Sequence, residues 1–285
     1  MNENLPLALS IKDWLDDATR QLVFANIPSA RLDSELILAH TLRQPRSYLH
    51  AHNEHILTDR EQEIAGARLA LRLDHVPVAY IIGHKEFYGR RFRVTTATLI
   101  PRPESETLIE LLHQAIPKNA TLLAEKPLRL VDVGTGSGIL GITAKLMFPE
   151  LLVTLIDISR HTLGVAEQNA KQHGVQIEVL RSDLLAQYPY IADFIIANLP
   201  YVDSDWERSK ETDHEPAEAL FASDGGKALI NRLIIQTKDR LANGGYLILE
   251  ADPTQHKDII KYASSHGLLL AEQKDYGLLF QKVTK

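Results

Sequence analysis

The sequence predicts an α/β protein in which a small helical unit precedes an open, mostly parallel sheet. Three observations support this class. Apolar residues recur at helical spacing over about the first 75 residues. From Leu128 onward, short apolar runs alternate with helical patterns, as they do in doubly wound folds. The first of these runs ends in a glycine-rich turn at 134–138, which would let a ligand approach the backbone.

The composition limits the classes of function. The chain has 285 residues, enough for one large domain or two smaller ones, and its net charge of −6 argues against a general nucleic-acid binder. It has no cysteine, which excludes disulfides, thiolate metal sites and thiol nucleophiles. No apolar run approaches membrane-spanning length, and the start of the chain lacks the features of a secretion signal. We therefore expect the protein in the cytoplasm, with no membrane partner.

Residues 1–75 are expected to form the helical domain. A first amphipathic helix is marked by Ile11, Trp14, Leu15, Ala18 and Leu22. A second helix is expected around Leu36. Thr58 and Glu61 form a capping-box pattern, which predicts a further helix that runs to about Leu73. This domain shows no evident chemistry, so we expect it to bind a partner rather than to react.

Three histidines, His50, His52 and His55, are the one group of potential metal ligands in the helical domain. No neighbouring residue completes a recognised metal spacing. We therefore interpret them as a solvated cluster at a helix end, and we expect no metal.

Residues 76–100 change character and are expected to form a β-hairpin linker. The run 77–83 is apolar and β-branched, the run 87–94 alternates like a strand, and Gly83 and Gly89 punctuate the pair. This region is also the most basic in the chain. Its arginines either discourage edge-to-edge aggregation or form a contact surface for an acidic or RNA-associated partner.

Residues 101–285 are expected to form the α/β domain. Pro101 and Pro103 bracket Arg102 and restrain its backbone, and a helix is expected to start directly afterwards. Further apolar runs near the C-terminus predict a seven-stranded sheet with an antiparallel edge strand.

Four successive strands of this domain end in residues that suit a ligand. The first leads into the glycine turn, the second ends in Asp157, the third leads to Asp183 and the fourth to Asn198. Because the carboxyl ends of parallel strands share one edge of a sheet, these groups should converge there. Asp157 is placed to bind both hydroxyls of a ribose, and Asp183 to bind an adenine amino group. The glycine spacing lacks the further small residue of a dinucleotide fingerprint, so it favours a single nucleoside, as in S-adenosylmethionine.

Several longer motifs extend this pattern. They are P-V-A-Y-I-I-G-H-K-E-F-Y-G-R at 77–90, L-I-P-R-P-E-S-E at 99–106, D-V-G-T-G-S-G at 132–138, D-I-S at 157–159, S-D at 182–183, N-L-P-Y at 198–201, E-P-A-E-A-L at 215–220 and D-G-G at 224–226. Together they resemble the glutamine N5-methyltransferases that modify peptide-chain release factors, the HemK/PrmC family. The resemblance covers essentially the whole chain. It implies a seven-stranded, Rossmann-like class I methyltransferase sheet and S-adenosyl-L-methionine as the cofactor.

The resemblance also implies which residues form the site. The implied cofactor contacts are Gly134, Thr135, Gly136, Ser137, Gly138, Asp157, Asp183, Leu184 and Asn198. The implied substrate contacts are Arg102, Asn198, Leu199, Pro200 and Tyr201, of which the last four form the catalytic stretch. In the family, the asparagine side-chain oxygen and the next backbone carbonyl accept the two N–H bonds of the glutamine amide. These positions are Asn198 and Leu199.

The chain departs from the family pattern at two positions. Leu199 stands where the family has proline, and Ser105 where it usually has threonine. The acceptor at Leu199 is a main-chain oxygen, and Pro200 still favours an extended backbone there, so we expect activity to be retained. Tyr201 is expected to pack against the planar amide; the alternative is an aromatic that fills the floor of the cleft.

The implied reaction is methyl transfer to the N5 atom of the glutamine in the Gly-Gly-Gln loop of class-1 release factors. The implied state is a monomer without a stable nucleic-acid partner, with a charged loop at 206–214 that could close over the substrate. Three alternatives stay open: glutamine methylation of a ribosomal protein, adenine-N6 methylation of DNA, which uses the same N-x-P-Y logic, and a noncatalytic interaction protein.

Overall fold

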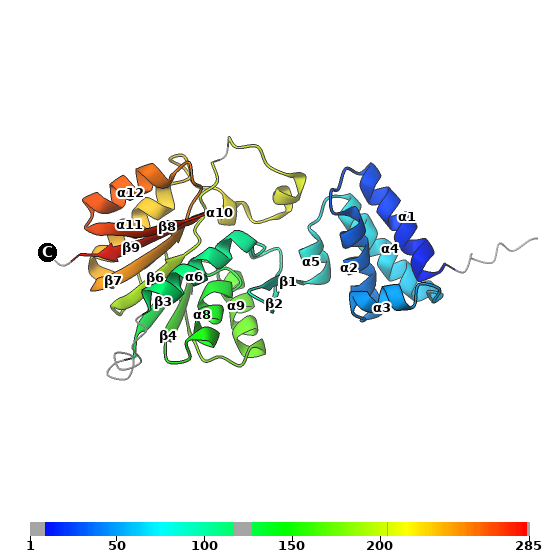
Figure 1. The fold of residues 1–285 in the computed structure, drawn as a ribbon, viewed down its shortest axis with the longest axis horizontal. Helices are drawn as coiled ribbons and strands as arrows, with labels where there is room; N and C mark the ends of the chain where they lie inside the picture. Colours follow the sequence, from blue (N-terminus) through cyan, green and yellow to red (C-terminus); the bar gives the residue numbers. More distant parts are fainter. Residues whose placement is uncertain (1–8, 117–126, 204, 284–285) are drawn as a thin grey trace, which may run out of the picture. The chain divides into compact units, whose positions relative to one another are not determined.

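The chain folds into two compact units. The computed structural model describes residues 9–116, 127–203 and 205–283. Within these residues, one unit contains 9–83 together with 209–214, and the other contains 84–208 and 215–283. Figure 1 shows the first unit as helices and the second as a sheet covered by helices.

The first unit is helical. Its helices are α1 (Ile11–Phe24), α2 (Ala30–Leu42), α3 (Arg46–Ala51), α4 (Asp59–Leu73) and α5 (Val78–Ile82), and residues 210–214 add the short 3₁₀ helix η2 (Lys210–His214). The capping box predicted at Thr58 is confirmed: its side chain accepts from the Glu61 backbone, and the Glu61 carboxylate accepts from Thr58 N at 2.8 Å. This cap starts α4, which ends at Leu73 as expected. The apolar faces of the helices enclose a buried core that includes Trp14 and Leu38.

The hairpin lies later in the chain than the sequence suggested. The expected strand at 77–83 is wrong, because these residues form α5, with Pro77 at its N-cap. Ala79 and Ile82, three residues apart, are both buried, which is the helical period, and α5 packs on α2 and α4. The hairpin strands are β1 (His84–Phe87) and β2 (Arg90–Arg93), which pair antiparallel.

The second unit is built on a seven-stranded sheet. Its strands are β3 (Arg129–Val133), β4 (Leu152–Asp157), β5 (Glu178–Arg181), β6 (Ala192–Ala197), β7 (Leu241–Glu250), β8 (Leu268–Lys274) and β9 (Gly277–Lys282). Its helices are η1 (Pro103–Ser105), α6 (Glu106–Ala115), α8 (Ile139–Met147), α9 (Arg160–Gln172), α10 (Ala217–Leu220), α11 (Ala228–Arg240) and α12 (His256–Ser265).

The strand order is β5-β4-β3-β6-β7-β9-β8. β9 is antiparallel to both of its neighbours, β7 and β8. The antiparallel strand is thus second from the edge, and the expectation that it forms the edge is wrong. Burial explains the order, because Leu278 and Phe280 of β9 are fully buried whereas Leu269 of β8 is 51% exposed.

Two hydrophobic layers fix the sheet between its helices. Leu130 packs into the layer under α6, α8 and α9, whereas its neighbour Val131 packs into the layer under α11 and α12 (Figure 1). Both faces of a doubly wound sheet are buried in this way, so its central strands are almost continuously apolar. Among the described helices, none combines the length and apolar character needed to cross a membrane.

The register of the parallel strands aligns their carboxyl ends. Val133 of β3 pairs with Ile156 of β4 and with Ala197 of β6, and Asp157 of β4 pairs with Arg181 of β5. The glycine turn and the residues that follow β4, β5 and β6 therefore leave the sheet along one edge, as predicted.

Candidate active site

A cavity of about 310 Å³ opens at the carboxyl edge of the sheet, within the second unit. This volume lies at the lower end of the range for small-molecule sites. Most of the predicted site residues line it: Arg102, Gly134, Thr135, Gly136, Ser137, Asp157, Asp183, Leu184, Asn198, Leu199 and Pro200. Gly138 and Tyr201 are not among the lining residues. The structure therefore brings nearly the whole predicted set together around one space.

The glycine turn adopts backbone conformations that side chains disfavour. Gly134, Gly136 and Gly138 have φ of 71°, 57° and 85°. At Gly138 a Cβ would also lie 2.7 Å from the Ile142 side chain, so this glycine serves the packing of α8 rather than the cavity wall. Gly136 has open space where its Cβ would be, which leaves its backbone accessible to a ligand.

Asp157 is held in place by backbone donors at the end of β4. Its Oδ2 accepts from Gly136 N at 3.2 Å and its Oδ1 from Ser159 N at 2.9 Å. Burial raises the pKa of Asp157, and these hydrogen bonds oppose the rise. A carboxylate fixed beside an open glycine backbone has the donor and acceptor set that a ribose diol requires, so the residues present fit the nucleoside part of S-adenosylmethionine.

Asp183 already has a side-chain partner. Its Oδ2 lies 2.6 Å from Arg232 on α11, and both side chains are about half exposed. Arg232 lines the cavity as well, and it gave no signal in the sequence. The contact between Asp183 and an adenine amino group remains a prediction, and the arginine is a competitor for the same carboxylate.

The stretch that follows β6 forms another wall of the cavity. Asn198 Nδ2 donates to Ser105 Oγ at 2.9 Å, which ties the amide to η1. Leu199 is buried at 3% exposure, and its Cδ2 would lie 2.8 Å from a Cβ built on Gly134. The leucine side chain therefore packs closely over the glycine turn. Position 134 needs glycine for space as well as for its φ.

Tyr201 is not among the residues that line the cavity, and both its side chain and its backbone are held by hydrogen bonds. Its hydroxyl donates to Glu250 Oε1 at 3.0 Å, and its carbonyl accepts from Gln255 Nε2 at 2.8 Å. Gly226 lies directly beneath it, where a Cβ would approach the Tyr201 carbonyl within 1.9 Å. Burial, followed by the charge of Glu250, raises the pKa of Tyr201. Its predicted packing against the substrate amide remains a prediction.

Arg102 lines the cavity and forms an ion pair with Glu215. The other oxygen of Glu215 accepts from Ile100 N at 3.0 Å. The Glu215 side chain is 2% exposed, so the segment after the catalytic strand is fastened to the segment before α6. Glu215 is thus bonded to the loop backbone at Ile100, and its ion pair holds Arg102 at the cavity.

Two buried residues support the glycine turn and were missed in the sequence. Asp132 Oδ2 accepts from Thr135 Oγ1 at 2.6 Å and from Gly141 N at 2.9 Å. Asn169 on α9 donates to Ser137 O at 2.8 Å. Asp132 could have been suspected, because it lies one residue before the end of the strand that leads into the glycines, whereas Asn169 lies in an ordinary helical pattern.

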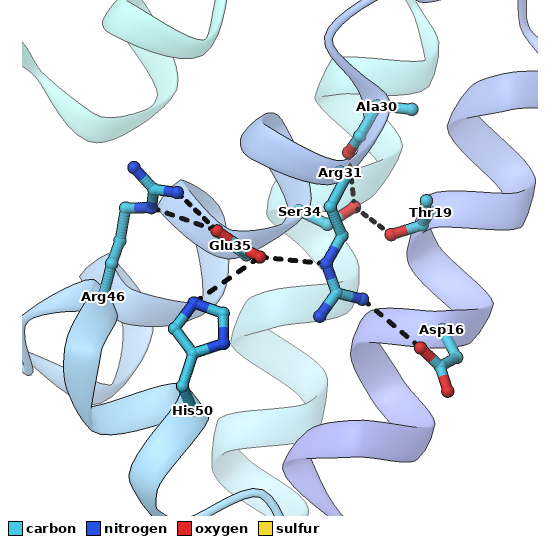
Figure 2. A network of polar contacts seen from close by, with 8 residues as sticks. All are labelled: Asp16, Thr19, Ala30, Arg31, Ser34, Glu35, Arg46 and His50. Atoms are coloured by element: carbon cyan, nitrogen blue, oxygen red, sulfur yellow. Dashed lines mark hydrogen bonds and ion pairs between the residues drawn. The ribbon is translucent and has the colours of Figure 1, made fainter.

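The histidine cluster of the helical unit has structural partners. His52 stacks on Tyr48 with ring centroids 4.0 Å apart, and His55 meets the same ring edge-on. His50 Nε2 lies 3.8 Å from the buried carboxylate of Glu35, which also binds Arg31 and Arg46. Figure 2 shows these three side chains converging on Glu35. Within the residues that the structure describes, no group of three or more His, Asp or Glu could hold a metal ion.

Two family models match the chain. The model described as "PrmC N-terminal domain" matches residues 13–83, and the model described as "Methyltransferase small domain" matches residues 108–279. The first lies within the helical unit, and the second covers most of the sheet and most of the residues that line the cavity.

Curated relatives match most of the chain. A release factor glutamine methyltransferase from Koribacter versatilis is 38% identical over 255 residues, which are 86% of this chain and 89% of the relative. A release factor glutamine methyltransferase from Coxiella burnetii is 34% identical over 261 residues, covering 91% and 92%. Among solved structures, a methyltransferase from Pyrococcus furiosus has the same fold, with a TM-score of 0.51, 15% identity and coverage of 77% of this chain and 98% of that one.

Proposed function

The chain belongs to the family of release factor glutamine methyltransferases, and on this premise we propose that it methylates the side-chain amide nitrogen of a glutamine in a peptide-chain release factor. The methyl donor is S-adenosyl-L-methionine. One observation carries the proposal. Asn198 and Leu199, the positions of the family's two amide acceptors, line the same cavity as the glycine turn and Asp157.

The cofactor half of the cavity is supported by the chain's own donors and acceptors. The open backbone at Gly136 and the fixed carboxylate of Asp157 suit the nucleoside. When bound, S-adenosylmethionine supplies a methyl group that is activated by its sulfonium. We propose that Asp183 and Leu184 contact the adenine, as the family resemblance implies.

The substrate half of the cavity has to compensate for the low nucleophilicity of an amide nitrogen. The nitrogen lone pair of glutamine is delocalised into its carbonyl, and no ordinary base removes the amide proton at neutral pH. Two fixed acceptors, the side-chain oxygen of Asn198 and the main-chain oxygen of Leu199, can hold both N–H bonds and orient the nitrogen. Orientation within a largely apolar wall is then the main contribution of the protein. Transfer forms a C–N bond, breaks the C–S bond and releases one amide proton.

The departure at Leu199 is consistent with this role. The acceptor is a backbone oxygen, so leucine keeps it. The buried leucine side chain packs on Gly134 and replaces the constraint of a proline ring with contacts. We therefore propose that activity is retained.

The finer points of the proposal concern the partner and the place of action. We propose that the target is the Gly-Gly-Gln glutamine of class-1 release factors, that residues 1–75 recognise the factor, and that the enzyme acts as a monomer in the cytoplasm. The net charge of −6 favours a protein substrate over DNA.

A parallel labelling assay tests the function. Purified chain and methyl-labelled S-adenosylmethionine are incubated with release factors, ribosomal proteins and DNA. We expect label in the release factors, and no label in a release factor whose Gly-Gly-Gln glutamine is replaced by asparagine. Label in DNA alone, or in a ribosomal protein alone, would overturn the proposal in favour of that substrate.

The role of Asn198 is tested by Asn198→Ala. We expect methyl transfer to fall by roughly 100-fold or more, because an oriented hydrogen-bond acceptor is lost. Calorimetry should show S-adenosylmethionine binding close to that of the unchanged chain, whereas Asp157→Ala should lose binding. Full transfer activity in Asn198→Ala would refute the assignment.

A further inference from the structure

Gln255 lies in the loop that follows β7 and bonds directly to the catalytic stretch. β7 is a neighbour of β6 in the sheet, and Ala197 pairs with Leu249, so the loop after β7 leaves the sheet beside the stretch after β6. Gln255 is 5% exposed and immediately precedes α12. The mechanism described so far gives this buried side chain no role.

Both ends of the Gln255 carboxamide are bonded to backbone groups. Its Nε2 donates to the carbonyls of Tyr201 at 2.8 Å and Gly225 at 2.7 Å. Its Oε1 accepts from Asp252 N at 3.1 Å. Since a carbonyl can only accept and a backbone N–H can only donate, the two ends of this amide cannot be exchanged. Gln255 therefore has one orientation, in which it joins the catalytic stretch to the D-G-G motif at 224–226.

The peptide group that follows Tyr201 is fixed from both sides. Its carbonyl accepts from Gln255, and its N–H, which belongs to Val202, donates to Leu220 O at 3.0 Å. Gly226 packs against the same carbonyl, because a Cβ there would lie 1.9 Å from Tyr201 O and 2.5 Å from Gln255 Nε2. The D-G-G motif can therefore approach this closely only with glycine at position 226, whose φ of 80° favours glycine as well.

We propose that Gln255 is a positioning residue for methyl transfer, which aims the main-chain oxygen of Leu199 by fixing the end of the catalytic stretch. The inference rests on the proposed function, because this oxygen is one of the two acceptors of the substrate amide in that reaction. It adds Gln255 to the residues on which the reaction depends. It also gives the D-G-G motif a role, which is to leave room for this contact.

The bonds at Tyr201 act on the Leu199 oxygen through a short and stiff piece of backbone. The Leu199 carbonyl belongs to the peptide group before Pro200, and the fixed carbonyl belongs to the peptide group after Tyr201. Only φ and ψ of residues 200 and 201 separate the two groups, and the proline ring holds the first of these torsions at about −65°. At the other end, the Asn198 side chain is bonded to Ser105. A stretch that is fixed at both ends and stiffened between them holds the oxygen in one direction.

The first test replaces Gln255 with Met, which keeps the length of the side chain and removes its hydrogen bonds. We expect kcat for the release factor to fall by about 10-fold to 100-fold, because a displaced acceptor no longer aims the amide nitrogen at the methyl group. Calorimetric affinity for S-adenosylmethionine should stay unchanged, because the bonds of Gln255 go to none of the proposed cofactor residues. The unfolding temperature should fall, since two carbonyls lose their donor.

Lys282→Met is the matched control for lost stability. Lys282 Nζ donates to the carbonyls of Thr237 at 3.3 Å, Lys238 at 2.7 Å and Leu241 at 2.6 Å. Lys282 ends β9, which is antiparallel to β7, so it lies at the opposite edge of the sheet from the cavity. This variant should unfold at a lower temperature and keep kcat, whereas Gln255→Met should lower both.

A second pair of variants displaces the same carbonyl while keeping Gln255. In Gly226→Ala the new Cβ pushes on Tyr201 O, so kcat should fall and cofactor affinity should be kept. Gly267→Ala is the matched control, because its φ is also 80° and no described atom beyond its chain neighbours lies within 4 Å of its Cβ position. The backbone strain is thus the same in both variants, and only the one that crowds Tyr201 should lower kcat.

Each outcome decides for or against the role of Gln255. If Gln255→Met keeps the kcat of the unchanged chain, or if Gly226→Ala and Gly267→Ala have equal kcat, the inference is wrong and the proposed function stands. If Gln255→Met and Gly226→Ala both lose cofactor affinity, the contact maintains the fold rather than aims an acceptor, and the inference is wrong as well. If the unchanged chain transfers methyl to no glutamine, the proposed function and this inference fall together.

Discussion

At the scale of single residues, Asp132 shows how strongly burial near the carboxyl edge of the sheet affects the pKa of a carboxyl group. It is fully buried, and its Oδ1 has no hydrogen-bond partner within the described residues. Burial raises the pKa of Asp132 to about 6, although hydrogen bonds from Thr135 and Gly141 oppose the rise. The folded chain therefore holds this proton more tightly than the unfolded chain does. Its contribution to stability is complete below the unfolded pKa and is lost as the pH rises through about 6.

Asp132→Asn should remove this pH dependence. The amide oxygen can accept the same two bonds, and the side chain no longer ionises. Between pH 4 and pH 7 the free energy of unfolding of the variant should rise, relative to the unchanged chain, by up to about 3 kcal/mol. Urea unfolding of the chain without cofactor at both pH values measures this difference. A difference that is the same at pH 4 and pH 7 would contradict the assignment of the titration to Asp132.

Residues that close a strand were predictable from the sequence, whereas their partners were not. Asp157 and Asn198 follow apolar runs, and the shared edge of a parallel sheet is enough to bring them together. Ser105 binds Asn198 across 93 residues of chain, and Glu250 binds Tyr201 across 49. Such pairings depend on how separate elements pack. The sequence around a polar residue in a motif or at a strand end does not indicate which distant residue it binds.

At the scale of elements, α9 connects the glycine turn to the hairpin through one side chain. Asn169 is fully buried. Its Nδ2 donates to Ser137 O at 2.8 Å and to Arg93 O at 3.0 Å, and its Oδ1 accepts from Arg93 N at 2.7 Å. The amide thus satisfies backbone groups of two other segments that have few alternatives in a buried position.

Asn169→Leu should therefore weaken both folding and cofactor binding. It leaves the Arg93 amide and two carbonyls without their partner, which should lower the free energy of unfolding by about 2–4 kcal/mol. The glycine turn loses its attachment to α9, so calorimetry should show weaker binding of S-adenosylmethionine. Gln172→Leu is the matched control on the same helix, because its exposed amide also binds the hairpin, at Arg91 O. Equal effects of the two substitutions would contradict the role of Asn169.

The position of the hairpin shows that a short sequence pattern does not always distinguish a strand from a helix. The run 77–83 is apolar and β-branched, but seven residues are too few to separate a strand period from a helical one. Packing decides it: Ala79 and Ile82 are buried together against helices of the first unit, which favours α5. Tyr88 and Gly89, with φ of 50° and 69°, form the turn of the hairpin, so both of its strands follow α5 in the chain. Long elements with caps, such as α4, had no such ambiguity.

At the scale of the whole molecule, the chain enters the helical unit twice. Residues 209–214 belong to that unit, although both flanking stretches belong to the other. Arg72 explains the second entry. Its side chain is 1% exposed and binds Asp33 at 2.7 Å, the Val76 carbonyl at 3.2 Å and the carboxylate of Glu211. The segment that begins after the catalytic strand is therefore held in the helical unit by a buried cation.

Arg72→Met should show whether the two units serve different steps. Asp33 is 3% exposed and would lose its cation, so the free energy of unfolding of the helical unit should fall by about 3–5 kcal/mol. The cavity belongs wholly to the second unit, so calorimetric affinity for S-adenosylmethionine should not change. If the helical unit recognises the release factor, transfer to the intact factor should fall more than transfer to a short Gly-Gly-Gln peptide. Arg20→Met is the control, because its pair with Asp17 is exposed and should be worth less than about 1 kcal/mol. A loss of cofactor affinity in Arg72→Met, or an equal loss of transfer to factor and peptide, would contradict this division of roles.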